Sequence, residues 1–176
     1  MTDATTRARA VRLALFDVDG VLTDGRLYYG PSGEVMKAFH ILDGHGLKML
    51  AQSGVATGLL SGRRSACAAA RARELGIVHV ILGVEDKLAH FERLRGQLGL
   101  DASQCAFVGD DLPDTPVLER CGLAVAVANA VPEVKAIAHL VTSAAGGAGA
   151  VREFCEFVMR AQGTFEGASG RLGARG

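Results

Sequence analysis

Short apolar segments alternate along the chain with longer segments of helical pattern. Each apolar segment is nearly continuous, which is typical of parallel strands that are buried on both faces. We therefore predict strands at residues 11–16, 55–60, 78–82, 105–108 and 123–127. Together they imply a sheet of five or six parallel strands.

The segments between these strands carry helix signals. Residues 65–75 and 87–98 follow helical patterns that stop at Gly76 and Gly99, and glycine is common just past the end of a helix. Pro132 opens a further helix to about residue 138, because proline is favoured in a first turn. This alternation predicts a doubly wound α/β fold, a Rossmann-like core whose ligand site lies beyond the carboxyl ends of the parallel strands.

Residues 25–39 break the alternation and are typical of a β-hairpin. Two arms, 26–29 and 34–39, flank a Gly-Pro-Ser-Gly turn. We expect one domain at residues 11–162, with this hairpin inserted after the first strand. Residues 1–10 and 163–176 are predicted to be flexible, the second segment because it is rich in glycine and poor in large apolar residues.

Composition narrows the functional classes. A chain of 176 residues with 49% apolar content suits one domain with a sizeable core. Its 19 basic and 19 acidic residues are mixed and cancel, which argues against a nucleic-acid partner. The four cysteines lack zinc-site spacing, so buried reduced thiols are expected. The N-terminal apolar segment is short and ends at Asp17, so we expect no signal peptide, no membrane partner and a cytoplasmic location.

Polar residues gather where the predicted strands end. Taken singly, each has an ordinary explanation as a turn, a loop or a solvated helix residue. The Asp-Val-Asp sequence directly after a buried strand is different, because like charges so close repel one another unless a cation or a proton holds them together. Clustered carboxylates indicate a metal or catalytic site. The gathered residues are Asp17, Asp19, Ser61, Lys87, Asp110 and Asp111.

These residue types suit phosphoryl transfer. Mg²⁺ prefers oxygen ligands and usually takes one or two carboxylates together with a substrate phosphate, which favours Asp17 and Asp110 as ligands. One carboxylate can then attack phosphorus, and a second, two residues on, can protonate the leaving oxygen and later deprotonate water. Lys87 and Ser61 would bind the equatorial phosphoryl oxygens, where charge is spread in the transition state.

Four segments resemble, in order and spacing, the four motifs of the haloacid dehalogenase superfamily: residues 16–23, residues 60–62, Lys87 and residues 109–114. The resemblance implies that Asp17 is the nucleophile and that Asp19 is the acid/base and a metal ligand through its backbone carbonyl. It also implies that Asp110 is the remaining Mg²⁺ ligand, with Asp111 and Asp114 orienting the metal shell.

Members of this superfamily carry cap domains after the first motif or between the second and third. Here the first place holds only the hairpin, and the second interval, residues 61–87, has room for one helix and one strand. No cap domain is therefore expected. Because an open site would admit water, we expect a neighbouring subunit to supply the lid.

A closer resemblance is to the capless phosphatases of 3-deoxy-D-manno-octulosonate 8-phosphate, an eight-carbon sugar acid phosphate used in lipopolysaccharide synthesis. It covers residues 11–163, and its segments are 27–30, 33–34, 37–40, 43–46, 61–63 and 146–153. It implies a homotetramer in which hairpins assemble and neighbours complete each site. The substrate-binding residues that it implies are Asp19, His40, Asp43, Gly44, Lys48, Gly62, Arg63, Arg71, Lys87 and Asp111.

The residue types at four positions bear on substrate binding beyond the resemblance itself. A guanidinium suits the carboxylate of a keto-sugar acid, which favours Arg63 and Arg71, although Arg71 fits a solvated helix position equally well. Ala148 replaces a basic residue of the family's glycine-rich segment, which puts one contact of the C-terminal tail in doubt. His40 replaces a frequent asparagine and could make binding depend on pH.

Other functions stay open at this stage. Phosphatases of nine-carbon keto-sugar acid phosphates share the capless tetrameric form but tend to have an acidic residue where this chain has Arg63, and a less specific sugar phosphatase is a further alternative. A non-catalytic phospho-acceptor module also combines aspartates, magnesium, a hydroxyl and a lysine. Asp19 argues against it, because a carboxylate that activates water shortens the life of an acyl phosphate. A purely structural subunit would have little use for the intact cluster.

Overall fold

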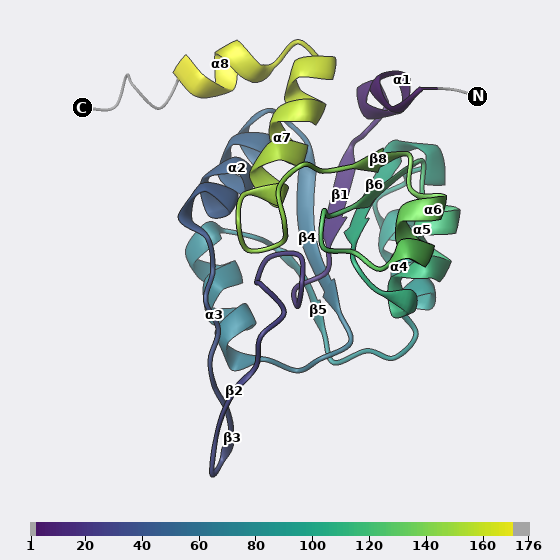
Figure 1. The fold of residues 1–176 in the computed structure, drawn as a ribbon. Helices are drawn as coiled ribbons and strands as arrows, with labels where there is room; N and C mark the ends of the chain where they lie inside the picture. The colour runs from purple at the N-terminus through teal and green to yellow at the C-terminus, as the bar shows by residue number, and fades with distance from the viewer. Residues whose placement is uncertain (1–2, 171–176) are drawn as a thin grey trace.

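The computed structural model describes residues 3–170, and its centre is a six-stranded sheet in the order β5-β4-β1-β6-β7-β8 (Figure 1). All five strand pairs of this sheet are parallel. The strands are β1 (Leu13–Phe16), β4 (Ala56–Ser61), β5 (His79–Leu82), β6 (Cys105–Gly109), β7 (Leu123–Ala126) and β8 (Leu140–Val141). The predicted doubly wound α/β class is confirmed.

Strand β1 lies in the middle of the sheet. Leu13 is in register with Ala56 of β4 and Cys105 of β6, and the pairing continues to Phe16. Since neighbouring strands cover both edges of β1 and helices cover both faces of the sheet, all four of its side chains are buried. The sheet therefore delivers whatever follows Phe16 to the centre of its carboxyl edge.

Helices form a layer on each face of the sheet (Figure 1). One layer holds α2 (Ile41–Gln52), α3 (Ala66–Leu75) and α7 (Ala150–Ala161). The other holds α4 (Lys87–Gln97), α5 (Thr115–Arg120) and α6 (Pro132–Ile137), and two short 3₁₀ turns, η1 (Ala102–Gln104) and η2 (Leu112–Asp114), flank β6. Helix α7 meets the sheet through Phe154, whose ring lies 5.5 Å from that of Phe16 in an edge-on arrangement.

The predicted hairpin is formed by β2 (Tyr28–Gly30) and β3 (Gly33–Met36), which pair antiparallel. It projects from the carboxyl end of the sheet (Figure 1). The chain passes from it directly into α2, and only α3 and β5 separate β4 from α4. No cap domain is inserted at either place. Within residues 3–170 no helix is long and apolar enough to cross a membrane.

Both ends of the described chain form helices in segments that were predicted to be flexible, residues 1–10 and 163–176. Helix α1 (Ala4–Arg9) is held by a buried Ala8, and the Gln162 side-chain amide donates to the carbonyl of Ala8 at 3.0 Å. In α8 (Phe165–Gly170) the Phe165 ring lies 3.8 Å from the Arg160 guanidinium. Residues 1–2 and 171–176 lie outside the described part of the chain.

Besides these terminal helices, several elements were not among those predicted: α2, α5, α7, β8 and the two 3₁₀ turns. Helix α2 carries Gly44 and Gly46 in its first turns, which lowers its intrinsic helix propensity, so tertiary packing, chiefly against α7, must stabilise it. Strand β8 has two residues, too few to give a pattern. Helix α7 did carry a signal, because its buried side chains recur at spacings of three and four. They include Val151, Phe154 and Val158.

Candidate active site

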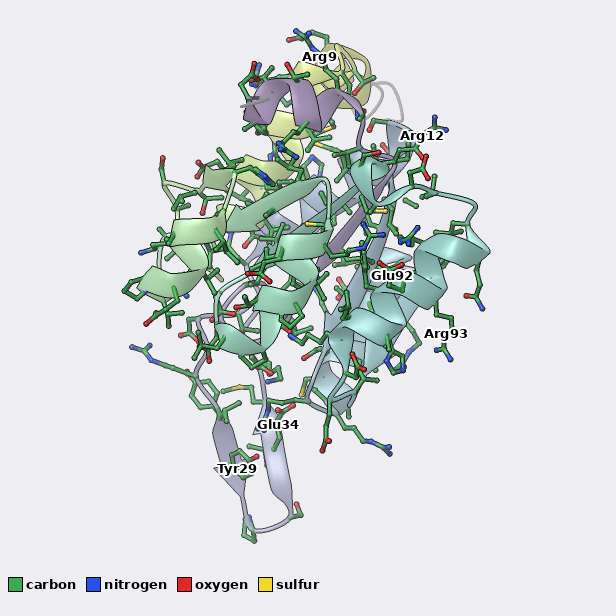
Figure 2. The ribbon with its side chains drawn as sticks, turned by 90° about the vertical axis from the view of Figure 1, so that its right-hand side faces the viewer. Arg9, Arg12, Tyr29, Glu34, Glu92 and Arg93 are labelled. Carbon is green, nitrogen blue, oxygen red and sulfur yellow. The ribbon has the colours of Figure 1, made fainter. Side chains whose placement is uncertain are left out.

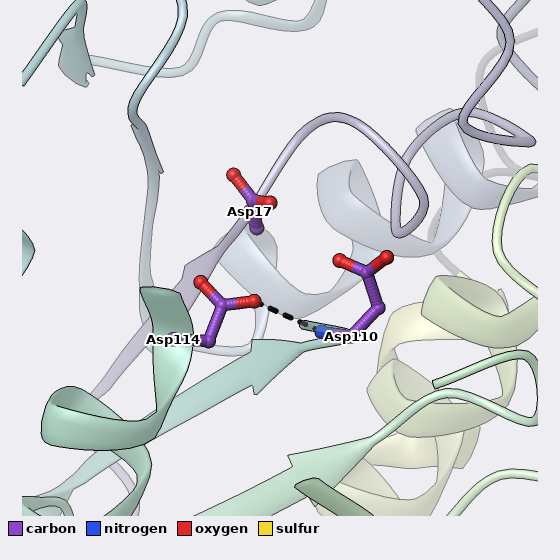
Figure 3. A group of neighbouring side chains, drawn as sticks. All are labelled: Asp17, Asp110 and Asp114. Carbon is purple, nitrogen blue, oxygen red and sulfur yellow. Dashed lines mark hydrogen bonds between the residues drawn. The ribbon is translucent and has the colours of Figure 1, made fainter. Parts of the chain in front are cut away.

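Three carboxylates meet at the carboxyl edge of the sheet (Figure 3). Asp17 follows β1, Asp110 follows β6, and Asp114 ends η2. Each offers one oxygen, and these oxygens all lie within 4.8 Å of one another. Asp17 and Asp110 come together because β1 and β6 are adjacent parallel strands in register. The structure therefore brings together both carboxylates that were expected to hold the metal.

Asp114 supports this cluster with hydrogen bonds. Its Oδ2 accepts the backbone N–H of Asp110 at 2.9 Å, as the dashed line in Figure 3 marks, and its Oδ1 accepts from Lys87 Nζ at 2.6 Å. The close approach depends on Gly109, since a Cβ there would lie 2.6 Å from the Asp114 carboxylate. Lys87 Nζ also lies 3.0 Å from Asp17 Oδ1. Lys87 thus bridges Asp17, which follows β1, and Asp114, which ends η2.

The cluster has the electrostatics of a cation site. Burial, followed by the charges of Asp17, Asp114 and Asp111, raises the pKa of Asp110 to about 8. Burial and the charge of Asp114 raise the pKa of Asp17 to about 6. Asp110 Oδ1 is also buried without a hydrogen-bond partner in the described chain. A hard dication would offset the repulsion and bind this oxygen, so the residues fit Mg²⁺.

Lys87 stays charged within this site. Burial opposes its charged form, but the carboxylates of Asp17 and Asp114 outweigh that effect and raise its pKa. Its side chain is only 5% exposed. A protonated, desolvated ammonium beside Asp17 can hold both the nucleophile and an anionic phosphoryl oxygen.

The loop after β1 is shaped to make room for Asp110. Gly20 has φ +87°, and a Cβ at this position would overlap the Asp110 carboxylate. The side chain of Asn129 donates to the Gly20 carbonyl at 3.0 Å and accepts from the N–H of Gly146 at 2.6 Å. Sequence reasoning missed Asn129, because nothing in its neighbourhood distinguishes it from an ordinary loop residue.

A cavity of about 200 Å³ opens over these groups. It is smaller than the roughly 300–1,000 Å³ of pockets that enclose a whole small ligand, so it suits the phosphoryl end of a substrate. All four predicted catalytic residues line it, and so do five of the ten predicted substrate-binding residues, two of which, Asp19 and Lys87, are also among the catalytic ones. The lining consists of Asp17, Asp19, Ser61, Gly62, Arg63, Lys87, Asp110, Asp111, Pro113 and Asp114.

Five other predicted substrate-binding residues do not line this cavity. The clearest case is Asp43 on α2, which is 1% exposed and accepts the N–H groups of Arg152 at 2.8 Å and Gly149 at 3.3 Å. It therefore caps the start of α7, and burial still raises its pKa. Substrate contact by Asp43 stays a prediction.

The remaining four lie along α2 and α3. Gly44 packs against the Arg71 guanidinium, which a Cβ on Gly44 would overlap, and Arg71 also pairs with Glu74 at 2.8 Å. Lys48 is exposed. His40 precedes α2, and its Nδ1 is buried without a hydrogen-bond partner in the described chain. Substrate contact by these four residues also stays a prediction.

Sequence reasoning also missed the contacts that residues of the hairpin and the segment after it make with Asp19 and Arg63. Lys37 Nζ donates to Asp19 Oδ1 and lies 3.0 Å from Glu34 Oε2. The Tyr29 hydroxyl accepts from Arg63 Nη2 at 2.8 Å. These residues fall within segments that resemble known phosphatases, but the resemblance was used only to predict assembly through the hairpin and assigned no contact to Tyr29, Glu34 or Lys37.

Known proteins match nearly the whole chain. The family described as haloacid dehalogenase-like hydrolase matches residues 74–154. The chain is 44% identical over 168 residues to 3-deoxy-D-manno-octulosonate 8-phosphate phosphatase KdsC of Yersinia pestis, covering 96% of this chain and 90% of the relative. Its identity to KdsC of Escherichia coli K12 is 42% over 169 residues, covering 96% of this chain and 90% of that protein.

Solved structures agree with these matches. The 3-deoxy-D-manno-octulosonate 8-phosphate phosphatase of Moraxella catarrhalis, solved with magnesium, phosphate and KDO, has a TM-score of 0.92 at 40% identity, covering 96% of this chain and 97% of the other. The cobalt-bound Haemophilus influenzae phosphatase has a TM-score of 0.90 at 40% identity, covering 94% and 99%. The chain belongs to the KdsC family of 3-deoxy-D-manno-octulosonate 8-phosphate phosphatases, within the haloacid dehalogenase-like hydrolases.

Proposed function

We propose that this chain is a Mg²⁺-dependent phosphatase that hydrolyses 3-deoxy-D-manno-octulosonate 8-phosphate to 3-deoxy-D-manno-octulosonate and phosphate, a step in lipopolysaccharide synthesis. One observation carries the proposal: the acidic cluster, Ser61 and Lys87 line a single cavity in a member of this family. The relative solved with magnesium, phosphate and KDO supports both the metal and the substrate.

The reaction divides between two carboxylates. An oxygen of Asp17 attacks phosphorus, the bond from phosphorus to the sugar oxygen breaks, and Asp19 gives that oxygen its proton. Asp19 then takes a proton from water, whose oxygen attacks the aspartyl phosphate and releases inorganic phosphate with restored Asp17. Both residues line the cavity, two positions apart on the loop after β1.

Other side chains stabilise the phosphoryl group as charge builds on it. Lys87, already within 3.0 Å of Asp17, would pair with an equatorial oxygen, and the Ser61 hydroxyl would donate to another. Mg²⁺, held by the carboxylates of Asp17 and Asp110 and the backbone carbonyl of Asp19, would neutralise phosphoryl charge. Asp114 keeps Asp110 and Lys87 in place.

We further propose a homotetramer in which hairpins assemble and neighbouring subunits cover each site. The cavity encloses only part of a substrate, and large apolar side chains on and after the hairpin are exposed. They include Tyr29, Val35, Met36, Ile41 and Leu42. Light scattering on the purified protein tests this, because a monomer with full activity contradicts it and Val35→Glu with Met36→Glu should disperse a tetramer.

The eight-carbon substrate is favoured over a nine-carbon one by Arg63. This residue lines the cavity at the position where nine-carbon phosphatases tend to be acidic, and a guanidinium can pair with the substrate carboxylate. The test is phosphate release from 3-deoxy-D-manno-octulosonate 8-phosphate and from hexose, pentose and nine-carbon keto-acid phosphates, each with and without Mg²⁺. Preference for the nine-carbon acid would overturn the substrate assignment. Absence of turnover with every ester would overturn the proposal that the chain is an enzyme.

A further inference from the structure

Asp19 is held by two cations that lie outside its own loop. Lys37 Nζ, from the segment after β3, donates to Asp19 Oδ1. Arg63 Nε, from the loop after β4, lies 3.6 Å from Asp19 Oδ2. That distance is too long for a hydrogen bond, and Oδ2 is buried without a hydrogen-bond partner in the described chain. One oxygen of Asp19 is therefore fixed and the other is free beside the cavity.

Lys37 is itself fixed by a chain of contacts that begins on α3. Its side chain is fully buried, and its second carboxylate partner is Glu34 Oε2 at 3.0 Å. Glu34 Oε1 accepts from the hydroxyl of Ser65, which caps α3 by accepting the N–H of Ala68 at 3.1 Å. Figure 2 shows Glu34 on the projecting hairpin. The order of contacts is Ser65, Glu34, Lys37, Asp19, and it ties the hairpin to the catalytic loop.

We propose that Lys37 is a positioning residue, which orients Asp19 by holding Oδ1 so that Oδ2 faces the leaving oxygen of the substrate. The inference rests on the proposed function, in which Asp19 protonates that oxygen. The adjacent Gly20, at φ +87°, places no side chain against Asp19, so contacts from other elements must set its rotamer. Lys37 supplies the direct hydrogen bond among those contacts.

Stability alone is a weak reason for a lysine here. Asp19, Glu34, Lys37 and Arg63 form a group of two acids and two bases, in which the attraction of the buried Lys37 to its carboxylate partners is largely offset by desolvation, and the half-exposed Arg63 is screened by solvent. Replacing the whole group by hydrophobic side chains could keep the stability, whereas a hydrophobic side chain at position 37 alone would leave the carboxylates of Asp19 and Glu34 without their lysine partner. The lysine at this position is better explained by the hydrogen bond that it donates to the proton donor.

Two phosphate esters with different leaving groups distinguish a positioning role of Lys37 from a purely structural one. A sugar alkoxide needs a proton as it leaves, whereas p-nitrophenolate leaves without one. For Lys37→Met we expect kcat/KM to fall about 100-fold with 3-deoxy-D-manno-octulosonate 8-phosphate but less than about 5-fold with p-nitrophenyl phosphate. The loss should lie in kcat rather than in KM. Lys37→Arg, which can still donate to Asp19, should recover most of it.

Further variants exclude a simple charge effect. Lys37→Met with Glu34→Gln restores charge balance without restoring the hydrogen bond, so its selective loss should persist. In an Asp19→Asn background, Lys37→Met should add almost nothing, because both changes act through one group. Lys135→Met on α6, which removes a lysine that does not line the cavity, should leave the hydrolysis of both esters unaffected. Melting curves show which variants are folded.

The outcomes distinguish the two proposals. Equal losses of kcat/KM with both esters, or losses that add to those of Asp19→Asn, would overturn the role of Lys37 while leaving the enzyme assignment intact. If Lys37→Met does not fold, Glu34→Gln carries the test, since it loosens Lys37 without removing it: a smaller loss confined to the sugar ester supports positioning, and wild-type kinetics refute it. A wild-type protein that hydrolyses neither ester would overturn the function as well.

Discussion

The floor of the cavity and its surroundings differ in how their side chains are held. On the floor, Asp17, Asp110, Asp114 and Lys87 follow or adjoin buried strands, and ion pairs and hydrogen bonds link them. Around it, on the hairpin and along α2, large apolar side chains and Lys48 are exposed. One chain thus links the groups that act on phosphorus to one another, whereas the apolar surface around them stays exposed.

This difference suggests a division of labour between chain and assembly. The floor must hold reacting atoms within a fraction of an ångström, which rigid strands can do without help. In the proposed tetramer, selection of the sugar acid can depend on surfaces that form only when hairpins associate or when substrate binds. Changes on the floor should therefore act on kcat, and changes around it on KM or assembly.

The largest effect is expected from Asp17→Asn, which removes the nucleophile from the floor. An amide oxygen cannot form the aspartyl phosphate, so turnover should fall by about 10⁴-fold or more. Phosphate release measures the loss, and acid quenching should trap no phosphorylated protein. Asp17→Glu is a useful control, because it keeps the charge but misplaces the oxygen. Normal turnover in Asp17→Asn would refute the mechanism.

Gly20→Ala should come next, because its methyl group would overlap the Asp110 carboxylate. We expect activity to fall about 100-fold and the rise in melting temperature on adding Mg²⁺ to be lost, since a bound ligand stabilises by about 2.7 kcal/mol at 100 times its Kd. Gly54→Ala is the matched control. Its φ of +100° carries similar backbone strain, but its methyl would meet nothing within 4 Å. If both variants lost activity and the Mg²⁺ response to the same extent, backbone strain alone would explain the loss.

The same contrast explains what could be predicted from the sequence. Asp17, Ser61 and Asp110 were found because parallel strands bring their carboxyl ends to one edge, so a residue's place after an apolar segment fixes its place in space. Lys37 and Asn129 were not found, since their roles depend on loops whose paths no local pattern encodes. The capping role of Asp43 could not be predicted for the same reason. Nothing in its segment signals that it caps a helix more than a hundred residues away.

A moderate effect on stability is expected from Asp43→Ala. It removes the side chain that accepts the N–H groups of Gly149 and Arg152 at the start of α7, and loss of such a cap typically costs about 0.5–2 kcal/mol. Urea unfolding should show a lower midpoint at unchanged slope. Asp3→Ala is the comparison, because it removes an exposed cap from α1 and should cost less. An unchanged midpoint with a raised KM would instead place Asp43 in substrate binding.

The smallest effect is expected from Arg71→Ala, outside the cavity. Arg71 lies against Gly44 and pairs with Glu74, so it touches none of the groups that act on phosphorus. If its guanidinium helps to bind the sugar acid, KM should rise about 10-fold while kcat stays within about 2-fold, which is the signature of lost uniform binding. Arg73→Ala, on the same helix but exposed, should change neither constant. A fall in kcat for Arg71→Ala would break the division between floor and surroundings, because it would connect this helix to the chemistry itself.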